Sequence, residues 1–201
     1  MSTLKLEKIT GQEGLGGAAS PITFSGDTAT LGSGATIQSG ATISSGVTFP
    51  AGMMIQVVDN PINSIITRGV STTLGPFSTP FNVTISNCLS TSKILVSCYV
   101  THSCTVDNIA MFALYDNTNS QYVAAQNDDG HFGSSVDSGG RVRSSSFQVL
   151  YDPPSFSSGS LQIELYMKGS GGSGTHKLNT RSQEDGYGRG ASNIILQEIA
   201  G

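Results

Sequence analysis

The chain has 201 residues, a length that fits one domain or one domain with a small appendage. Glycine (25), serine (30) and threonine (19) are abundant, whereas charged residues make up only 12%. This composition argues against long amphipathic helices and favours an all-β protein, and the net charge of −4 argues against a nucleic-acid-binding surface.

The N-terminal segment, residues 1–20, is polar and contains the glycine-rich run Gly11–Gly17. It has no apolar run of signal-peptide length, and no stretch of the chain approaches the roughly 18 apolar residues of a membrane span. We therefore expect neither secretion nor membrane insertion, and we interpret residues 1–20 as an arm that attaches the protein to a partner.

Residues 21–52 contain a repeat of six residues. An apolar residue recurs with this period at Leu31, Ile37, Ile43 and Phe49, and a glycine follows three positions after each of them. Phased columns of this kind indicate a repeat architecture. A period of six suits a β-helix or β-prism in which each short extended segment turns at a glycine and directs one apolar side chain inward.

The repeat is too short to fold alone. A solenoid needs at least three stacked units to bury its core, and here four apolar side chains would have to order about twenty Gly- and Ser-rich residues. Other copies of the chain would have to close the prism, and three copies do so most simply. The sequence therefore predicts a trimeric stalk over 21–52, with Leu31, Ile37, Ile43 and Phe49 at the trimer axis. The alternative is a Ser/Gly linker.

From Pro50 onward the apolar pattern has a period of two. In 160–168, Leu161, Ile163, Leu165 and Met167 share one face, and Gln162, Glu164, Tyr166 and Lys168 share the other. This alternation predicts a half-buried antiparallel strand. The segment 93–100 is apolar enough on both faces to be central. Turn signals separate the candidate strands, which are 53–58, 64–73, 81–86, 93–100, 109–115, 121–125, 141–151, 160–168, 175–181 and 193–199.

Eight to ten short strands in about 150 residues predict a β-sandwich resembling a jelly roll over 53–201. The chain has three cysteines, Cys88, Cys98 and Cys104, without metal-ligand spacing. Cys98 shares a strand face with apolar neighbours and reads as a small buried hydrophobe. A Cys98–Cys104 disulfide is the less favoured alternative.

Candidate catalytic groups are few. His102 and Cys104 could meet on one face of a strand, but nothing in the sequence orients the base. A glycosidase needs two positioned carboxylates, and of Glu164, Glu184 and Glu198 two read as outward strand residues. The run Gly169–Gly174 lacks the Lys-Ser/Thr of a phosphate loop. We predict no catalytic residue, cofactor or resident metal.

Two polar loops, 126–140 and 182–190, are candidates for recognition, because loops on a rigid sandwich commonly carry it. The segment 128–131 could alternatively be a solvated turn; it lacks the ligand spacing of a calcium loop. The second loop could be a plain hairpin connection. The recognition candidates are Asp128, Asp129, His131, Glu184, Tyr187 and Arg189.

Several segments together resemble the small fibre-type structural proteins of tailed bacteriophages, especially marine and cyanobacterial ones. They are the MSTLKLEKI start, the Gly/Ser/Thr repeats, the FPAGMMIQVV hinge, the STSKILV strand and the ILQEIA ending. The resemblance runs from about residue 1 to 201. It implies a homotrimer, an N-terminal anchor to other virion proteins, an exposed C-terminal β domain and no enzyme activity.

The resemblance leads to two expectations about function. The first is a trimeric fibre or knob on tail or capsid that contacts a host-surface glycan or protein. The second is a capsid decoration protein that bridges capsomers and stabilises the head. Typical tail fibres are longer and begin with a dedicated tail-binding domain, so the shorter chain favours a head fibre or decoration protein. In both cases the protein would be made in the host cytoplasm and reside in the virion.

Overall fold

The computed structural model describes residues 22–25, 28–31, 49–123, 133–137, 141–171, 173–181 and 190–201. The chain divides into two compact units, Met1–Val47 and Thr48–Gly201. In the first unit, β1 (Ile22–Ser25) and β2 (Thr28–Leu31) form an antiparallel hairpin in which Ile22 pairs with Leu31. This hairpin lies within the segment predicted as a stalk.

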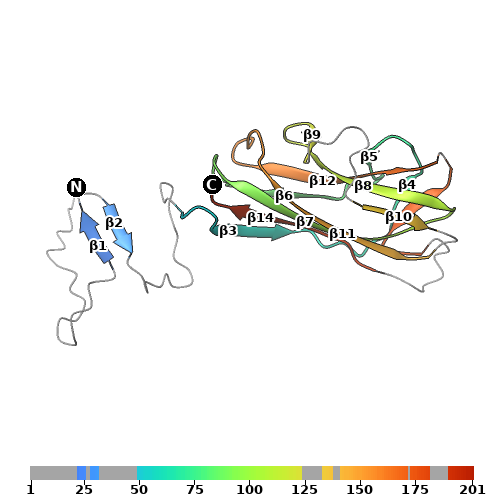
Figure 1. Ribbon diagram of the computed structural model, residues 1–201, viewed down its shortest axis with the longest axis horizontal. Coiled ribbons are helices and arrows are strands. Elements are labelled where there is room, and N and C mark those ends of the chain that lie inside the picture. The colour runs from blue at the N-terminus through green and yellow to red at the C-terminus, as the bar shows by residue number, and fades with distance from the viewer. Residues whose placement is uncertain are drawn as a thin grey trace, which may run out of the picture. The chain divides into compact units, whose positions relative to one another are not determined.

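The second unit is built from antiparallel strands in two layers (Figure 1). Its strands are β3 (Met54–Asp59), β4 (Ile66–Gly69), β5 (Gly75–Pro76), β6 (Asn82–Ile85), β7 (Lys93–Cys104), β8 (Asn108–Asp116), β9 (Gln121–Tyr122), β10 (Gly133–Asp137), β11 (Arg143–Tyr151), β12 (Leu161–Gly169), β13 (Thr175–Leu178) and β14 (Asn193–Ile199). Within the described residues there is no helix, and so none with the length and hydrophobicity to cross a bilayer. The all-β prediction is confirmed.

One layer, here called the β7 sheet, has the order β3-β14-β7-β13-β4, and β11 pairs with the other side of β7. The other layer, the β12 sheet, has the order β10-β8-β12-β5, with β6 paired to β12 and β9 paired to β8. The prediction that 93–100 forms a central strand is confirmed, because β7 has β14 on one side and β11 on the other.

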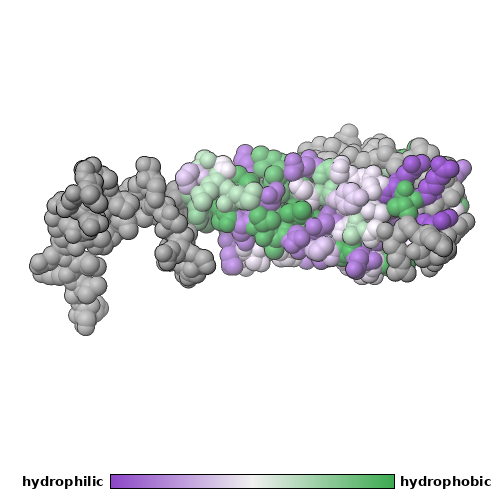
Figure 2. All heavy atoms as spheres, turned by 90° about the horizontal axis from the view of Figure 1, so that it is seen from below, coloured by the Kyte–Doolittle hydropathy of each residue, from purple (hydrophilic) through white to green (hydrophobic). Residues whose placement is uncertain are grey.

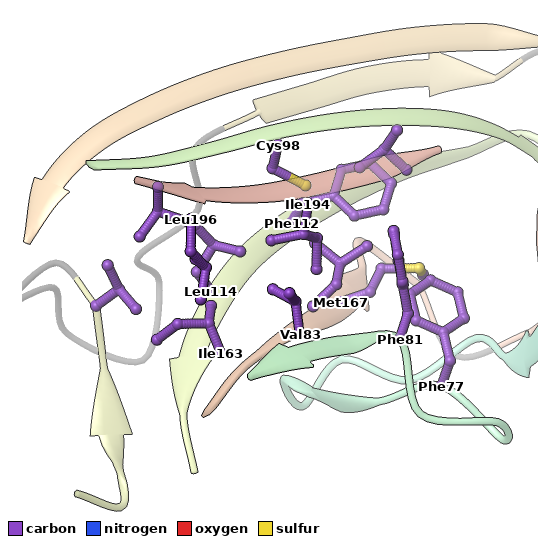
Figure 3. Close-up of a cluster of buried hydrophobic side chains, with 14 of the residues drawn as sticks. Phe77, Phe81, Val83, Cys98, Phe112, Leu114, Ile163, Met167, Ile194 and Leu196 are labelled. Atoms are coloured by element: carbon purple, nitrogen blue, oxygen red, sulfur yellow. The ribbon is translucent and has the colours of Figure 1, made fainter. Parts of the chain in front are cut away.

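The hydrophobic core fills the space between the two sheets (Figure 3). From the β12 sheet, Phe112, Leu114, Ile163 and Met167 are fully buried. They face residues of the β7 sheet that include Cys98, Ile194 and Leu196. Each such side chain contributes about 1.5–3 kcal/mol on burial, so the period-two pattern of these strands accounts for the packing of the two layers.

The three cysteines are free thiols, so the Cys98–Cys104 disulfide is absent. Cys98 is 3% exposed and lies among Ile94, Val96 and Val100, as predicted. Burial raises the pKa of Cys98, and burial together with the charge of Glu198 raises the pKa of Cys88 to about 12. Both side chains are therefore protonated thiols with little nucleophilic character.

Each predicted strand range from 53–58 to 193–199 overlaps an observed strand. Two strands of the second unit lie outside the predicted ranges. Gly75–Pro76, a turn signal in the sequence, forms the short strand β5 against Met167 and Tyr166. Part of the expected loop 126–140 forms β10, which pairs with β8 from Asn108 to Phe112. This strand is rich in glycine and serine, which have low strand propensity, so the sequence did not indicate it. It forms because β8 offers backbone groups to pair with.

The structure confirms the outward positions of Glu164 and Lys168 and shows that the expected outward position of Glu198 is wrong. Glu164 and Lys168 stand on the outer face of β12, yet neighbouring side chains leave them only 6% and 7% exposed. Glu198 is fully buried, on the same inner face of β14 as Ile194 and Leu196. Its carboxylate accepts hydrogen bonds from Leu89 N (2.8 Å), Ser92 Oγ (2.7 Å) and Gln56 Nε2 (2.6 Å).

Candidate interaction surface

The outer face of the β7 sheet carries a group of apolar side chains that nothing in the described part of the second unit covers. The register places Val57, Gln197, Leu95 and Leu150 side by side across β3, β14, β7 and β11. Ile195 and Tyr99 extend the face along β14 and β7. We call this set, with Met53 and Met54 at the start of β3, the outer apolar face.

Its side chains are strongly exposed for their type. Val57 is 54% exposed and Leu150 55%, while Met53, Met54 and Tyr99 are each 46% exposed. Figure 2 shows the molecule from this side, where apolar residues gather over the sheet. A contiguous apolar patch of this kind on a folded domain marks an interaction site, because leaving it in water forfeits the free energy of burial.

A shallow groove of about 470 Å³ crosses the outer apolar face between β14, β7 and β11. Two pairs of polar side chains along it are hydrogen-bonded to each other: Gln148 Nε2 donates to Ser97 Oγ (2.7 Å), and Tyr99 Oη and Ser144 Oγ share a hydrogen bond (2.9 Å). The groove is lined by Ser97, Cys98, Tyr99, Ser146, Phe147, Gln148, Asn193 and Ile195. A docked partner would therefore meet a mixed surface, in which Tyr99 and Ile195 are bordered by hydroxyl and amide groups.

Charges lie at the ends of this face rather than in its middle. Lys93, at the start of β7, forms an ion pair with Asp152 at 3.5 Å. Arg143 lies at the far end, where β11 begins opposite His102. An apolar centre with charged margins is the usual arrangement of a protein–protein interface.

The sheet also ends in an unpaired edge. Among the described residues β3 pairs only with β14, so its second edge has free backbone donors and acceptors. The exposed Asp59 and the irregular pairing at Glu198/Ile199 reduce the tendency of such an edge to pair with other strands. The edge strand is nonetheless the one that bears Met54 and Val57.

The sequence-predicted interaction residues fall mostly outside the described residues. Ile37 and Ile43 of the predicted axis lie there, as do all six recognition candidates, Asp128, Asp129, His131, Glu184, Tyr187 and Arg189. Leu31 ends β2, and Phe49 is half-buried in the second unit. The predicted axis and the recognition candidates therefore stay predictions.

Sequence reasoning missed the outer apolar face. Its signal was present in the runs MMIQVV, KILV, QVLY and NIIL, which are apolar at adjacent positions rather than at alternate ones. Such runs indicate strands that are buried on both faces. Each run lies in the β7 sheet, and together they predict a covering layer that the described residues of one chain do not supply.

The candidate Cys–His pair lies inside the sandwich. His102 is 1% exposed and Cys104 is fully buried, and the His102 ring packs edge-on against Phe112 with centroids 4.8 Å apart. Burial, His176 and Arg143 lower the pKa of His102 to about 4. A neutral, buried imidazole between two sheets is a packing group in this arrangement.

His176 lies on β13, opposite Cys104 of β7, and is also 1% exposed. Burial and the charge of Arg68 lower its pKa to about 4. No three His, Cys, Asp or Glu side chains of the described residues come together in a way that could hold a metal ion. The two histidines therefore have the environment of a buried structural pair.

No protein-family model matches the chain, and no curated protein matches it in sequence. Solved structures with a similar arrangement include that of infectious bursal disease virus Gx strain, which is 12% identical, with a TM-score of 0.34 over 74% of this chain and 37% of that chain. For the Gt strain the identity is 10%, the TM-score 0.31 and the coverage 86% and 45%. The chain spans less than half the length of these proteins.

Proposed function

We propose that the protein is a non-enzymatic structural component of a virion, a short homotrimeric fibre or knob whose β-sandwich is exposed for adhesion to a host surface. The bacteriophage setting comes from the sequence resemblance. The trimer comes from the six-residue repeat. The single structural observation that supports the proposal is the outer apolar face, which requires a covering partner.

A second copy of the same chain is the partner that fits best. The outer apolar face starts at Met53, four residues after Phe49, the last apolar position of the repeat. Copies that associate through the repeat would therefore hold their β3 strands near one another. Apolar side chains from each copy could then cover those of the next without any charge to neutralise.

The proposal assigns no catalytic step. Two of the ionisable groups that the sequence singled out are used within the fold: His102 packs on Phe112, and Glu198 accepts three hydrogen bonds inside the sandwich. Groups held in this way stabilise the native state and are not free to act on a substrate.

Labelled particles test the proposal. Purified particles of the bacteriophage that encodes the chain are labelled with a gold-conjugated antibody against the β-sandwich and imaged. The gold should mark short projections on tail or head. Label spread evenly over the capsid lattice would instead favour the decoration protein. Particles that carry neither label nor the chain by mass spectrometry would contradict a virion role.

A further inference from the structure

The outer face of the β12 sheet bears a polar groove, on the opposite side of the sandwich from the outer apolar face. It has a volume of about 430 Å³ and is lined by Thr84, Asn117, Thr118, Ser157, Ser160 and Gln162. These residues come from β6, β12, the β8–β9 turn and the turn before β12. Each presents a hydroxyl or amide group, and none bears a charge.

Hydrogen bonds hold the groove in one shape. Gln162 donates from Nε2 to Thr84 Oγ1 (3.2 Å) and accepts at Oε1 from Asn117 Nδ2 (3.1 Å). The β8–β9 turn is fixed by buried Asp116, which accepts from Thr118 N (2.8 Å) and Asn119 N (3.0 Å). A groove with preset donors and acceptors loses little conformational entropy when it binds a ligand.

Glu164 holds one of the groove residues, Asn117, in place. Its Oε2 accepts from Asn117 Nδ2 at 2.7 Å. Its Oε1 is buried without a hydrogen-bond partner among the described residues. A buried carboxylate oxygen left without a donor is costly, and this one is too enclosed for a groove ligand to reach without a shift of the neighbouring side chains.

Three tyrosines continue the same face beyond Glu164. Tyr115 lies opposite Glu164 in the register, and its ring stacks on Tyr166 with centroids 4.5 Å apart. Tyr122 meets both rings edge-on, at 5.3 Å and 6.2 Å. The rings are half-buried, so they offer a firm apolar edge with phenolic groups beside the polar groove.

We propose that this groove and the tyrosine cluster form a binding site for a neutral oligosaccharide. Sugar hydroxyls donate and accept hydrogen bonds, as amides and hydroxyls do, and the C–H faces of a sugar ring pack against aromatic side chains. A phosphate, sulfate or carboxylate ligand would find no cation in the groove lining. Arg68, the cation beside Tyr122 and Tyr166, donates to the backbone carbonyls of Gly75, Met167 and Thr73. The site lies within a single copy of the chain. The site would supply the ligand class for the proposed adhesive role, and this part of the inference rests on the proposed function.

An array of oligosaccharides tests the site. The full-length chain is applied to neutral oligomers of glucose, galactose, mannose and N-acetylglucosamine, printed beside sulfated and sialylated ones. We expect binding to at least one neutral series. Absence of binding to every neutral series, or binding to the anionic ones alone, would overturn the proposal.

Variants then locate the binding by titration calorimetry with the strongest neutral oligomer. Gln162→Ala should weaken binding at least tenfold, because it removes the amide that spans the groove. Gln148→Ala, the same change on the opposite sheet, should leave the affinity within twofold. Thr84→Ala is the second groove variant if Gln162→Ala does not fold. Equal affinity of the wild-type chain and the folded groove variant would overturn the site.

Sedimentation of the same samples separates this proposal from the proposed function. A trimer that binds no neutral sugar would remove the oligosaccharide site and leave the structural role. A monomer that binds sugar through Gln162 would keep the site and remove the trimeric fibre.

Discussion

Two buried histidines make the stability of the β-sandwich depend on pH. Burial, the nearby His176 and Arg143 lower the pKa of His102 from 6.5 to about 4. Burial and Arg68 lower the pKa of His176 by the same amount. Above pH 6.5 both are neutral in the folded and unfolded states. Between pH 6.5 and 4 the unfolded chain binds protons that the folded chain does not, so stability falls as the pH falls.

The expected loss is measurable in a narrow window. Each histidine can contribute at most roughly 3 kcal/mol by pH 4, and about 1–2 kcal/mol by pH 5. Urea unfolding at pH 7.0 and pH 5.0 checks this, in a range where most carboxylates stay ionised. His102→Phe, which keeps a ring beside Phe112, should reduce the difference. Equal free energies of unfolding at the two pH values would contradict the buried neutral pair.

Glu198 is the charged residue on the inner face of β14, next to Ile194 and Leu196. Replacement by alanine would leave the donors of Leu89, Ser92 and Gln56 without their acceptor. We expect Glu198→Ala to lower the free energy of unfolding by about 2–4 kcal/mol, since each buried donor left unpaired costs about 1–3 kcal/mol. Glu198→Gln keeps an acceptor oxygen and should cost clearly less. Denaturant titration measures both; a loss below about 0.5 kcal/mol for the alanine variant would contradict this role.

The strands themselves were largely predictable from the sequence, because period-two alternation reports directly which face of a strand is buried. The inner residues Ile163, Leu165 and Met167 show this for β12. The same parity placed Glu198 with Ile194 and Leu196, but its charge argued for an outward position. Its burial depends on donors about 110 and 140 residues away in the chain, Ser92 and Gln56, which no local pattern reveals.

The two interaction surfaces were less accessible to sequence reasoning. Runs such as KILV and NIIL indicate a strand covered on both faces, but they do not say whether the cover comes from the same chain. The polar groove joins Thr84, Asn117 and Gln162, which come together only through the pairing of β12 with β6 and β8. Serines, threonines and amides are frequent throughout this sequence, so their presence alone marked no site.

Charged substitutions at the centre of the outer apolar face of the β7 sheet should weaken association between copies of the chain. Val57→Asp combined with Leu150→Asp places two carboxylates in the proposed contact while both side chains remain over half exposed in a single copy. The fold should therefore persist, and the dissociation constant of the oligomer should rise at least 100-fold, because unpaired buried charges are costly. Sedimentation over a concentration series measures this.

Thr84→Asp provides the matched control for that pair. It adds a carboxylate to an exposed strand position on the outer face of the β12 sheet. It should leave the oligomeric state unchanged. An oligomer unaffected by the Val57 and Leu150 changes, or equally weakened by the Thr84 change, would show that the contact lies elsewhere.

At the scale of the whole molecule, the repeat and the outer apolar face both lack a surface to cover their apolar side chains. Four apolar residues of the repeat are too few to form a core in one chain, and the described residues of one chain leave the outer apolar face of the β7 sheet uncovered. Association of three copies would satisfy both at once. It would also leave the polar groove of the β12 sheet on the outside of each copy, where a surface ligand can reach it.

The mass of the full-length protein in solution tests this account most directly. Sedimentation equilibrium at micromolar concentration should give a particle of three chains, each of 20.8 kDa, that persists on dilution. A species with the mass of one chain across the whole concentration range would contradict the account, because the outer apolar face and the repeat would then both remain exposed to water.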